Sequence, residues 1–110
     1  MNTPSYLEIG SKSTKTSSTF FADVFGWEYA PMDESNGWFQ APTIKVGIHD
    51  DDPNPQIYVF FAVDDLQQAM NRVRKAGGIA EEPEPVEPGF GRFCNCKDPT
   101  GIAFGLHEKV

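Results

Sequence analysis

The chain repeats itself once, and this repeat limits the folds open to it more than any other feature. When residues 6–39 are shifted by 52 positions, Tyr6 falls on Tyr58, Gly26 on Gly78, Pro31 on Pro83, Gly37 on Gly89 and Trp38 on Phe90. Near the end of each half the register slips by six, so that residues 44–50 match residues 102–108. Two copies indicate a duplicated module, because a solenoid needs at least three repeats.

Both halves show the same order of elements: a strand, a helix and three short strands. The pattern predicts strands at residues 5–10, 27–31, 38–41 and 43–49, and again at 57–63, 79–82, 92–96 and 102–107. Proline and glycine separate them. The segment 50–55 holds two prolines and is interpreted as a linker, and residues 81–91, with three prolines, as a surface loop.

The two helices are predicted from their caps and from apolar spacing. Ser13 or Thr14 can cap the first helix, which ends at Gly26 and carries an apolar face of Phe20, Phe21, Val24 and Phe25. Asp64 is the expected N-cap of the second. Its apolar positions are Leu66, Ala69, Met70 and Val73, and Gly77-Gly78 stops it.

Length and composition favour one domain made of both modules. The chain has 110 residues, of which 39% are hydrophobic, and two separate cores of half that size would each be marginal. We therefore expect an α+β domain over residues 1–110, with modules at about 5–50 and 56–109.

Charge and cysteine usage exclude several partners. The net charge of −7 argues against nucleic acid, and the small basic cluster Arg72, Arg74 and Lys75 is interpreted as a solvated helix face. No apolar run reaches the roughly 20 residues that a membrane span needs, and no signal peptide is apparent. Cys94 and Cys96 are expected to be reduced thiols, so we expect a cytoplasmic protein.

The order of several segments resembles that of the vicinal-oxygen-chelate superfamily, which contains the glyoxalase, bleomycin-resistance and extradiol-dioxygenase proteins. The segments are Tyr6-Leu7-Glu8-Ile9, Phe20-Phe21 with Val24-Phe25-Gly26-Trp27, Val63-Asp64-Asp65-Leu66 with Ala76-Gly77-Gly78, and Asp98-Pro99-Thr100-Gly101-Ile102-Ala103-Phe104-Gly105-Leu106. Within this superfamily, the chain resembles the group of predicted enzymes related to lactoylglutathione lyase. The resemblance implies two βαβββ modules that form a curved, barrel-like mixed sheet around a cavity.

The same resemblance implies where a metal would bind. Metal-dependent relatives take four ligands from symmetric places on the first and last strands of each module, which here hold Tyr6, Gly47, Tyr58 and Gly105. Neutral tyrosine is a poor ligand for a hard divalent ion and glycine offers no side chain. We therefore expect no metal at these positions, no cofactor, and no glyoxalase reaction, which needs a Lewis acid.

The two histidines offer an alternative site. His49 and His107 each lie two residues after the symmetric glycine, and Glu8 lies two residues after Tyr6. Residues two apart on a strand share a face, so Glu8, His49 and His107 could meet as catalytic residues or as ligands of a displaced divalent metal. Alternatively, the histidines lie at a solvated rim, or serve a bound ligand without metal.

Aromatic residues and glycines suggest a binding site. Tyr6, Tyr58 and Phe60 either fill the core or line a cavity, with Gly47 and Gly105 leaving room for a ligand. Arg92 either contacts an anionic ligand or faces solvent.

Three functions remain open. The first is a metal-free protein that binds a small organic molecule in an aromatic cavity between the modules. The second is a metal-dependent lyase or dioxygenase using Glu8, His49 and His107, and the third is an accessory interaction module without a ligand cavity. The resemblance also implies a homodimer.

Overall fold

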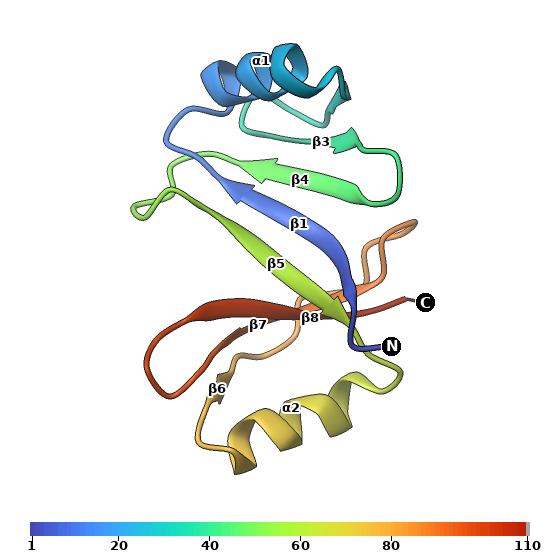
Figure 1. Cartoon of the computed structure of the whole chain (residues 1–110), viewed down its shortest axis with the longest axis vertical. Helices are drawn as coiled ribbons and strands as arrows, with labels where there is room; N and C mark the ends of the chain where they lie inside the picture. Colours follow the sequence, from blue (N-terminus) through green and yellow to red (C-terminus); the bar gives the residue numbers. More distant parts are fainter. Residues whose placement is uncertain (110) are drawn as a thin grey trace. The chain divides into compact units, whose positions relative to one another are not determined.

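The computed structural model describes residues 1–109, in which the order β-α-β-β-β occurs twice (Figure 1). The first copy consists of β1 (Pro4–Gly10), α1 (Thr14–Phe25), β2 (Glu28–Pro31), β3 (Asn36–Gln40) and β4 (Lys45–His49). The second consists of β5 (Gln56–Ala62), α2 (Leu66–Lys75), β6 (Ile79–Ala80), β7 (Arg92–Lys97) and β8 (Ala103–Glu108). The predicted α+β class and the duplicated module are confirmed, and strand ends differ from the prediction by one or two residues.

The chain divides into two compact units. The first unit contains residues 6–58, and the second contains residues 1–5 and 59–110. The strands of the first unit follow the order β2-β3-β4-β1, and those of the second follow β5-β8-β7-β6. In each unit the first and last strands pair in parallel, with Glu8 opposite Gly47 and Phe60 opposite Gly105. Neither set of four strands closes into a barrel, and the cavity expected between the modules stays a prediction.

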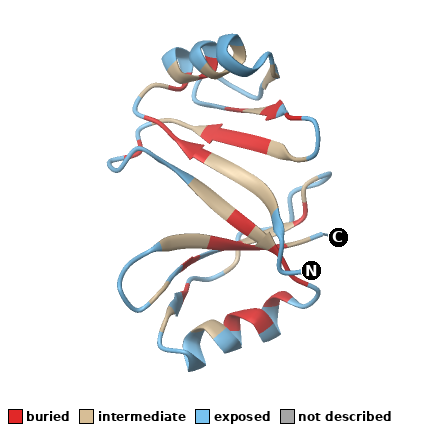
Figure 2. Ribbon diagram, viewed as in Figure 1, coloured by how far each residue is buried: buried red, intermediate tan, exposed pale blue. Residues whose placement is uncertain are grey.

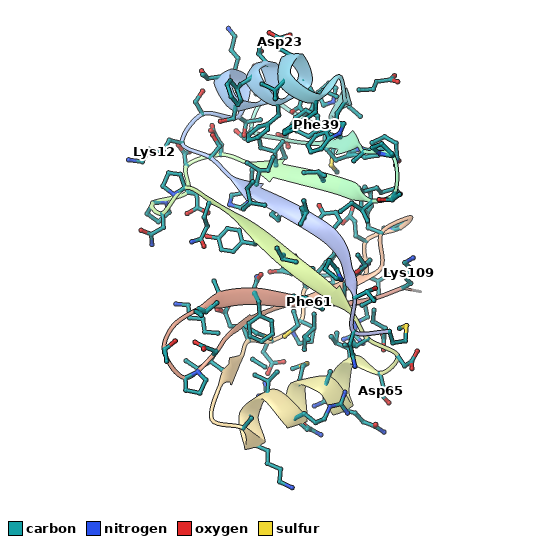
Figure 3. The ribbon with its side chains drawn as sticks, in the orientation of Figure 1. Lys12, Asp23, Phe39, Phe61, Asp65 and Lys109 are labelled. Atoms are coloured by element: carbon teal, nitrogen blue, oxygen red, sulfur yellow. The ribbon has the colours of Figure 1, made fainter. Side chains whose placement is uncertain are left out.

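The first unit buries the face of its sheet that α1 covers. Its core consists of Ile9, Phe39, Ala41, Val46 and Ile48. Phe39 is fully buried and lies beneath α1 (Figure 3). Because side chains alternate along a strand, burial of Val46 and Ile48 directs Lys45, Gly47 and His49 to the opposite face.

The apolar face predicted for α1 was wrong for three of its four residues. Ser13 caps the helix by accepting a hydrogen bond from Thr16 N, and Gly26 ends it with φ 68°, as expected. However, the buried residues of α1 are Thr14 and Ser18, whereas Phe20, Val24 and Phe25 are more than half exposed. Figure 2 shows most of α1 as exposed.

Packing along the helix explains this difference. Phe20 meets Phe21 edge-on at 5.3 Å, Phe25 lies 6.3 Å from Phe21, and Phe25 stacks on Trp27 at 4.7 Å. Of these aromatic side chains, Phe21 and Trp27 pack partly against the core. Phe20 and Phe25 pack against neighbouring aromatic side chains and not against the core. The apolar stripe in the sequence therefore did not identify the buried side of α1.

The second unit has a separate core beneath α2. Leu66, Ala69 and Met70 are buried against Cys94, Cys96 and Leu106, as the helical spacing predicted. Asp65, not Asp64, is the N-cap, because its carboxylate accepts from Gln68 N. The cysteines are free and buried, with their sulfur atoms 3.8 Å apart.

One hydrogen bond joins helix and sheet in the same way in both units. Asp50, which follows β4, accepts from Thr14 N at 2.8 Å, and Glu108, at the end of β8, accepts from Leu66 N at 2.8 Å. Each carboxylate thus binds the first backbone amide of its helix, where an acceptor is needed and the helix dipole favours negative charge.

Residues 81–91 are mostly exposed, in agreement with the predicted surface loop. An isolated β-bridge pairs Glu87 with Gly91 near the end of this loop.

Neither helix in the described part of the chain has the length and apolar character that crossing a bilayer requires.

The exposure of α1 leads to a stability prediction. We expect Phe20→Ser to change the free energy of unfolding by about 0.5 kcal/mol or less, as at other surface positions. Leu66→Ala should cost about 2–5 kcal/mol, because Leu66 is 1% exposed in the second core. Urea unfolding measures both. A loss of several kcal/mol for Phe20→Ser would mean that this side of α1 is covered.

Candidate functional site

The first unit carries a hydrogen-bonded cluster on the sheet face opposite α1. Tyr6 and Glu8 come from β1 and His49 from the end of β4, and the strand alternation places all three on this face. Tyr58, from the start of β5, and Asp52, from the segment after β4, complete the cluster.

His49 lies between two carboxylates. Its Nδ1 is 2.6 Å from Glu8 Oε2 and its Nε2 is 3.0 Å from Asp52 Oδ2. A hydroxyl donates to each carboxylate: Tyr6 Oη to Glu8 Oε1 and Tyr58 Oη to Asp52 Oδ2, both at 3.0 Å. The result is a chain of hydrogen bonds from tyrosine to tyrosine through one imidazole.

The segment expected to be only a linker supplies Asp52. Asp51 adopts a positive φ of 56°, which turns the chain back so that Asp52 N donates to Ser11 O at 2.9 Å. Asp52 is 8% exposed, and its Oδ1 accepts from Asn54 N at 2.8 Å. The sequence reasoning missed this residue, because three successive aspartates before Pro53 give no signal that one of them turns inward.

The cluster shifts the pKa of its members. Partial burial alone would lower the pKa of His49, but the hydrogen bonds and charges of Glu8 and Asp52 outweigh it and raise the pKa. The backbone amide of Asn54, with His49 and Tyr58, lowers the pKa of Asp52. Burial and the charge of Asp52 raise the pKa of Tyr58. Both ring nitrogens of His49 face carboxylate oxygens, and these contacts favour its protonated form.

The space above both symmetric glycines is filled by this chain's own side chains. A Cβ on Gly47 would lie 1.9 Å from Tyr6 Oη and 2.2 Å from Glu8 Oε1. A Cβ on Gly105 would lie 2.0 Å from the Phe60 ring. These glycines were expected to leave room for a ligand. In the structure they accommodate Tyr6, Glu8 and Phe60, and the ligand contacts predicted for these residues stay predictions.

The second unit carries an aromatic group in the equivalent place. Phe93 stacks on the His107 ring at 4.6 Å with an interplanar angle of 2°, and Phe60 meets Phe93 edge-on at 5.4 Å. Phe93 was not among the predicted site residues, although its position opposite His107 in the strand register would have indicated it.

His107 is not at a solvated rim. It is 4% exposed, with Nδ1 2.7 Å from Ser5 Oγ and Nε2 2.6 Å from Phe90 O. A carbonyl only accepts, so Nε2 carries the proton, and Nδ1 can then accept from the serine hydroxyl. Both ring nitrogens are therefore used within the second unit.

These contacts bear on the proposed metal triad. The structure brings Glu8 and His49 together, but both nitrogens of His107 are bound to other groups. Among residues 1–109, no three His, Cys, Asp or Glu side chains are arranged to hold a metal ion. At the places where metal-dependent relatives supply ligands, this chain has two tyrosines and two glycines, which do not fit a divalent ion.

Arg92 lies away from the aromatic group. Arg92 is two residues before the buried Cys94 on the same strand. Both side chains therefore point to the side of the sheet that α2 covers. Its Nη1 is 3.9 Å from Glu108 Oε1, the carboxylate that binds the start of α2. The anionic-ligand contact proposed for Arg92 stays untested.

Trp38 is a further residue on the face opposite α1 that the sequence did not single out for binding. It is the register partner of Gly47, and Lys45 Nζ lies 5.2 Å from the centre of its ring. A partly exposed indole beside the Tyr6–Glu8 pair adds a flat apolar surface to the charged cluster.

Comparison with known proteins gives consistent relatives. The model of the Glyoxalase/Bleomycin resistance protein/Dioxygenase superfamily matches residues 3–106. The chain is 27% identical to "Putative glyoxylase CFP32" of Mycobacterium bovis and of Mycobacterium tuberculosis, over 96% of this chain and 45% of the relative. It therefore spans less than half the length of these curated relatives.

Two solved structures show the same fold. The Mn(II)-bound glyoxalase from Novosphingobium aromaticivorans is 27% identical, with a TM-score of 0.76 over 99% of this chain and 39% of that one. A glyoxalase/bleomycin resistance protein/dioxygenase superfamily member from Vibrio splendidus is 18% identical, with a TM-score of 0.68 over 96% and 97% of the two chains.

The His49 cluster predicts a pH dependence. The pKa of His49 is raised above 6.5 in the folded chain, so its stabilising contribution is full below the unfolded pKa. It is lost as pH rises through the folded pKa. We expect ring NMR signals of His49 to titrate above pH 6.5, and Glu8→Gln to lower that pKa by removing one charged acceptor. Tyr6→Phe, which leaves both carboxylates, should change it less. An unchanged His49 titration in Glu8→Gln would contradict the cluster.

The filled space above Gly105 predicts a steric effect. Gly105→Ala should destabilise the chain by about 1–3 kcal/mol, because the new methyl group overlaps the Phe60 ring. In a Phe60→Ala background the same change should cost much less. Urea unfolding of the four variants of this cycle measures the coupling, and equal costs in both backgrounds would show that Phe60 does not lie over Gly105.

Proposed function

Because the chain belongs to the Glyoxalase/Bleomycin resistance protein/Dioxygenase superfamily, we propose that it is a metal-free member that binds a small organic molecule. The binding surface is the face of the first unit that carries Tyr6, Glu8, Trp38 and His49. The bound molecule is a small, flat compound with a cationic or hydrogen-bond-donating group.

The observation that carries this proposal is the filled space above Gly47. Metal-dependent relatives place a carboxylate ligand there, whereas this chain has the Tyr6 hydroxyl and the Glu8 carboxylate in that space. Glu8 in turn hydrogen-bonds Tyr6 and His49. A metal would have to break two existing hydrogen bonds to reach this carboxylate, and tyrosine offers little in return.

The charge of the cluster supports the class of ligand. The cluster holds two carboxylates and one imidazole, so its net charge is negative in either protonation state of His49, and the chain as a whole carries −7. The Glu8 side chain is 22% exposed and that of His49 35% exposed, so both are accessible. The indole of Trp38 and the ring of Tyr6 provide apolar surface beside the charge.

A homodimer belongs to the same proposal. The chain matches 45% of the length of its curated relatives, so two copies of it would together approach that length. Sedimentation velocity on the protein used for the binding measurements distinguishes one chain from two.

Metal content and cation binding test the proposal together. Tag-free protein, purified without chelator and then incubated with manganese, iron, zinc or nickel, should retain far less than one metal per chain by elemental mass spectrometry. A library of planar organic cations and their neutral isosteres, screened by tryptophan fluorescence, should yield binders among the cations. Stoichiometric metal would support the lyase or dioxygenase alternative instead.

A matched pair of variants locates the binding. Glu8→Gln should weaken binding of a cation about tenfold, as expected for the loss of a charged hydrogen-bond acceptor. Glu28→Gln removes an equal charge from the exposed β2 edge strand and should leave binding unchanged. Equal binding to both variants would show that the Glu8 cluster is not the site.

A further inference from the structure

The second unit has a pocket on the opposite side of its sheet from Phe60 and His107. The pocket has a volume of about 400 Å³ and lies between α2, the β7–β8 turn and β8. This volume is within the range of small-molecule sites, about 300–1,000 Å³. Its apolar walls are Val63, Ala69, Val73, Ala76, Phe104 and Leu106.

Small residues create the pocket. Ala69 and Val73 lie one turn apart on the side of α2 that packs on the second core, and Ala76 and Gly78 follow the helix. Alanine and glycine fill little of the space between helix and sheet, so the partly buried Val73 and Phe104 keep apolar surface facing the pocket. Unfilled apolar surface of this kind favours an apolar group of a ligand.

The rim of the pocket is positive, although the chain is strongly acidic. Arg72 and Lys97 border it, and among residues 1–109 neither side chain has a hydrogen bond or ion pair. Arg74 and Lys75 lie in the same last turn of α2. Four of the chain's nine lysines and arginines therefore either border the pocket or lie within three residues of Arg72 in the sequence.

The one carboxylate at the rim is already used by its own turn. Asp98 Oδ1 accepts from Thr100 N at 2.9 Å and from Ile102 N at 2.8 Å, and these amides lower the pKa of Asp98. Its carboxylate is thus held by the turn, and in the described part of the chain neither Arg72 nor Lys97 forms an ion pair with a carboxylate.

We propose that this pocket binds a small amphipathic anion, with an apolar chain against Val73 and Phe104 and an anionic head facing Arg72 and Lys97. The site is independent of the cation site proposed on the first unit, since it differs in unit, in sheet face and in sign of charge.

Octanoate is the probe, and its neutral isostere octanol is the control. Titration of ¹⁵N-labelled full chain should shift the amide signals of Ala69, Val73 and Ala76. Arg72→Gln and Lys97→Gln should each weaken octanoate binding about two- to fivefold, the range for exposed charges. Lys75→Gln, which does not line the pocket, should leave it unchanged. Octanol should bind more weakly than octanoate.

A second variant tests the pocket by filling it. Ala76→Leu places a larger apolar side chain at an exposed wall position and should abolish octanoate binding without unfolding the chain. Octanoate shifts at Phe60, Phe93 and His107 alone would overturn the proposal, as would equal binding of octanol and octanoate. Octanoate binding should survive Glu8→Gln, so this proposal can fail or succeed apart from the cation site.

Discussion

In both units, the first backbone amide of the helix donates a hydrogen bond to an acidic side chain at the end of the last strand. This contact determines on which face of the sheet the neighbouring side chains lie. Asp50 binds Thr14 N and Glu108 binds Leu66 N, so in each case the acid must lie on the helix side of its sheet. Strand alternation then places the preceding histidine, and the glycine two residues before it, on the other side. One capping contact therefore sets the face on which each potential site lies.

The two copies share this skeleton but differ in chemistry at one pair of equivalent positions. Glu8 and Phe60 occupy the same place opposite Gly47 and Gly105. In the first unit the carboxylate joins His49, Asp52 and two tyrosines into a charged network. In the second the phenylalanine covers its glycine and contacts Phe93, which stacks on His107. The exchange of acid for aromatic at this place, together with Phe93 opposite His107 where Asn36 is opposite His49, separates a polar surface from an apolar one.

The sequence predicted what depends on regular spacing. The repeat located both modules, and the six-residue slip placed Gly47 and Gly105, and His49 and His107, in equivalent positions. Contacts that depend on irregular backbone were not predicted. Asp52 reaches His49 only because Asp51 adopts a positive φ. The buried side of α1 was also not predicted, because Phe25 can stack on Trp27 instead of on the sheet.

The completeness of the His49 network limits what can bind there. Each carboxylate oxygen of Glu8 has one donor, Tyr6 Oη or His49 Nδ1, so a ligand that displaces either must offer a donor in exchange. An apolar molecule that displaced the Tyr6 hydroxyl would leave a partly buried carboxylate oxygen unpaired, which costs about 1–3 kcal/mol. A cationic donor would replace the neutral tyrosine hydroxyl with a charged donor, which adds a charge–charge attraction to the hydrogen bond. The same closed network that disfavours a metal therefore favours an organic cation over a neutral molecule of the same size.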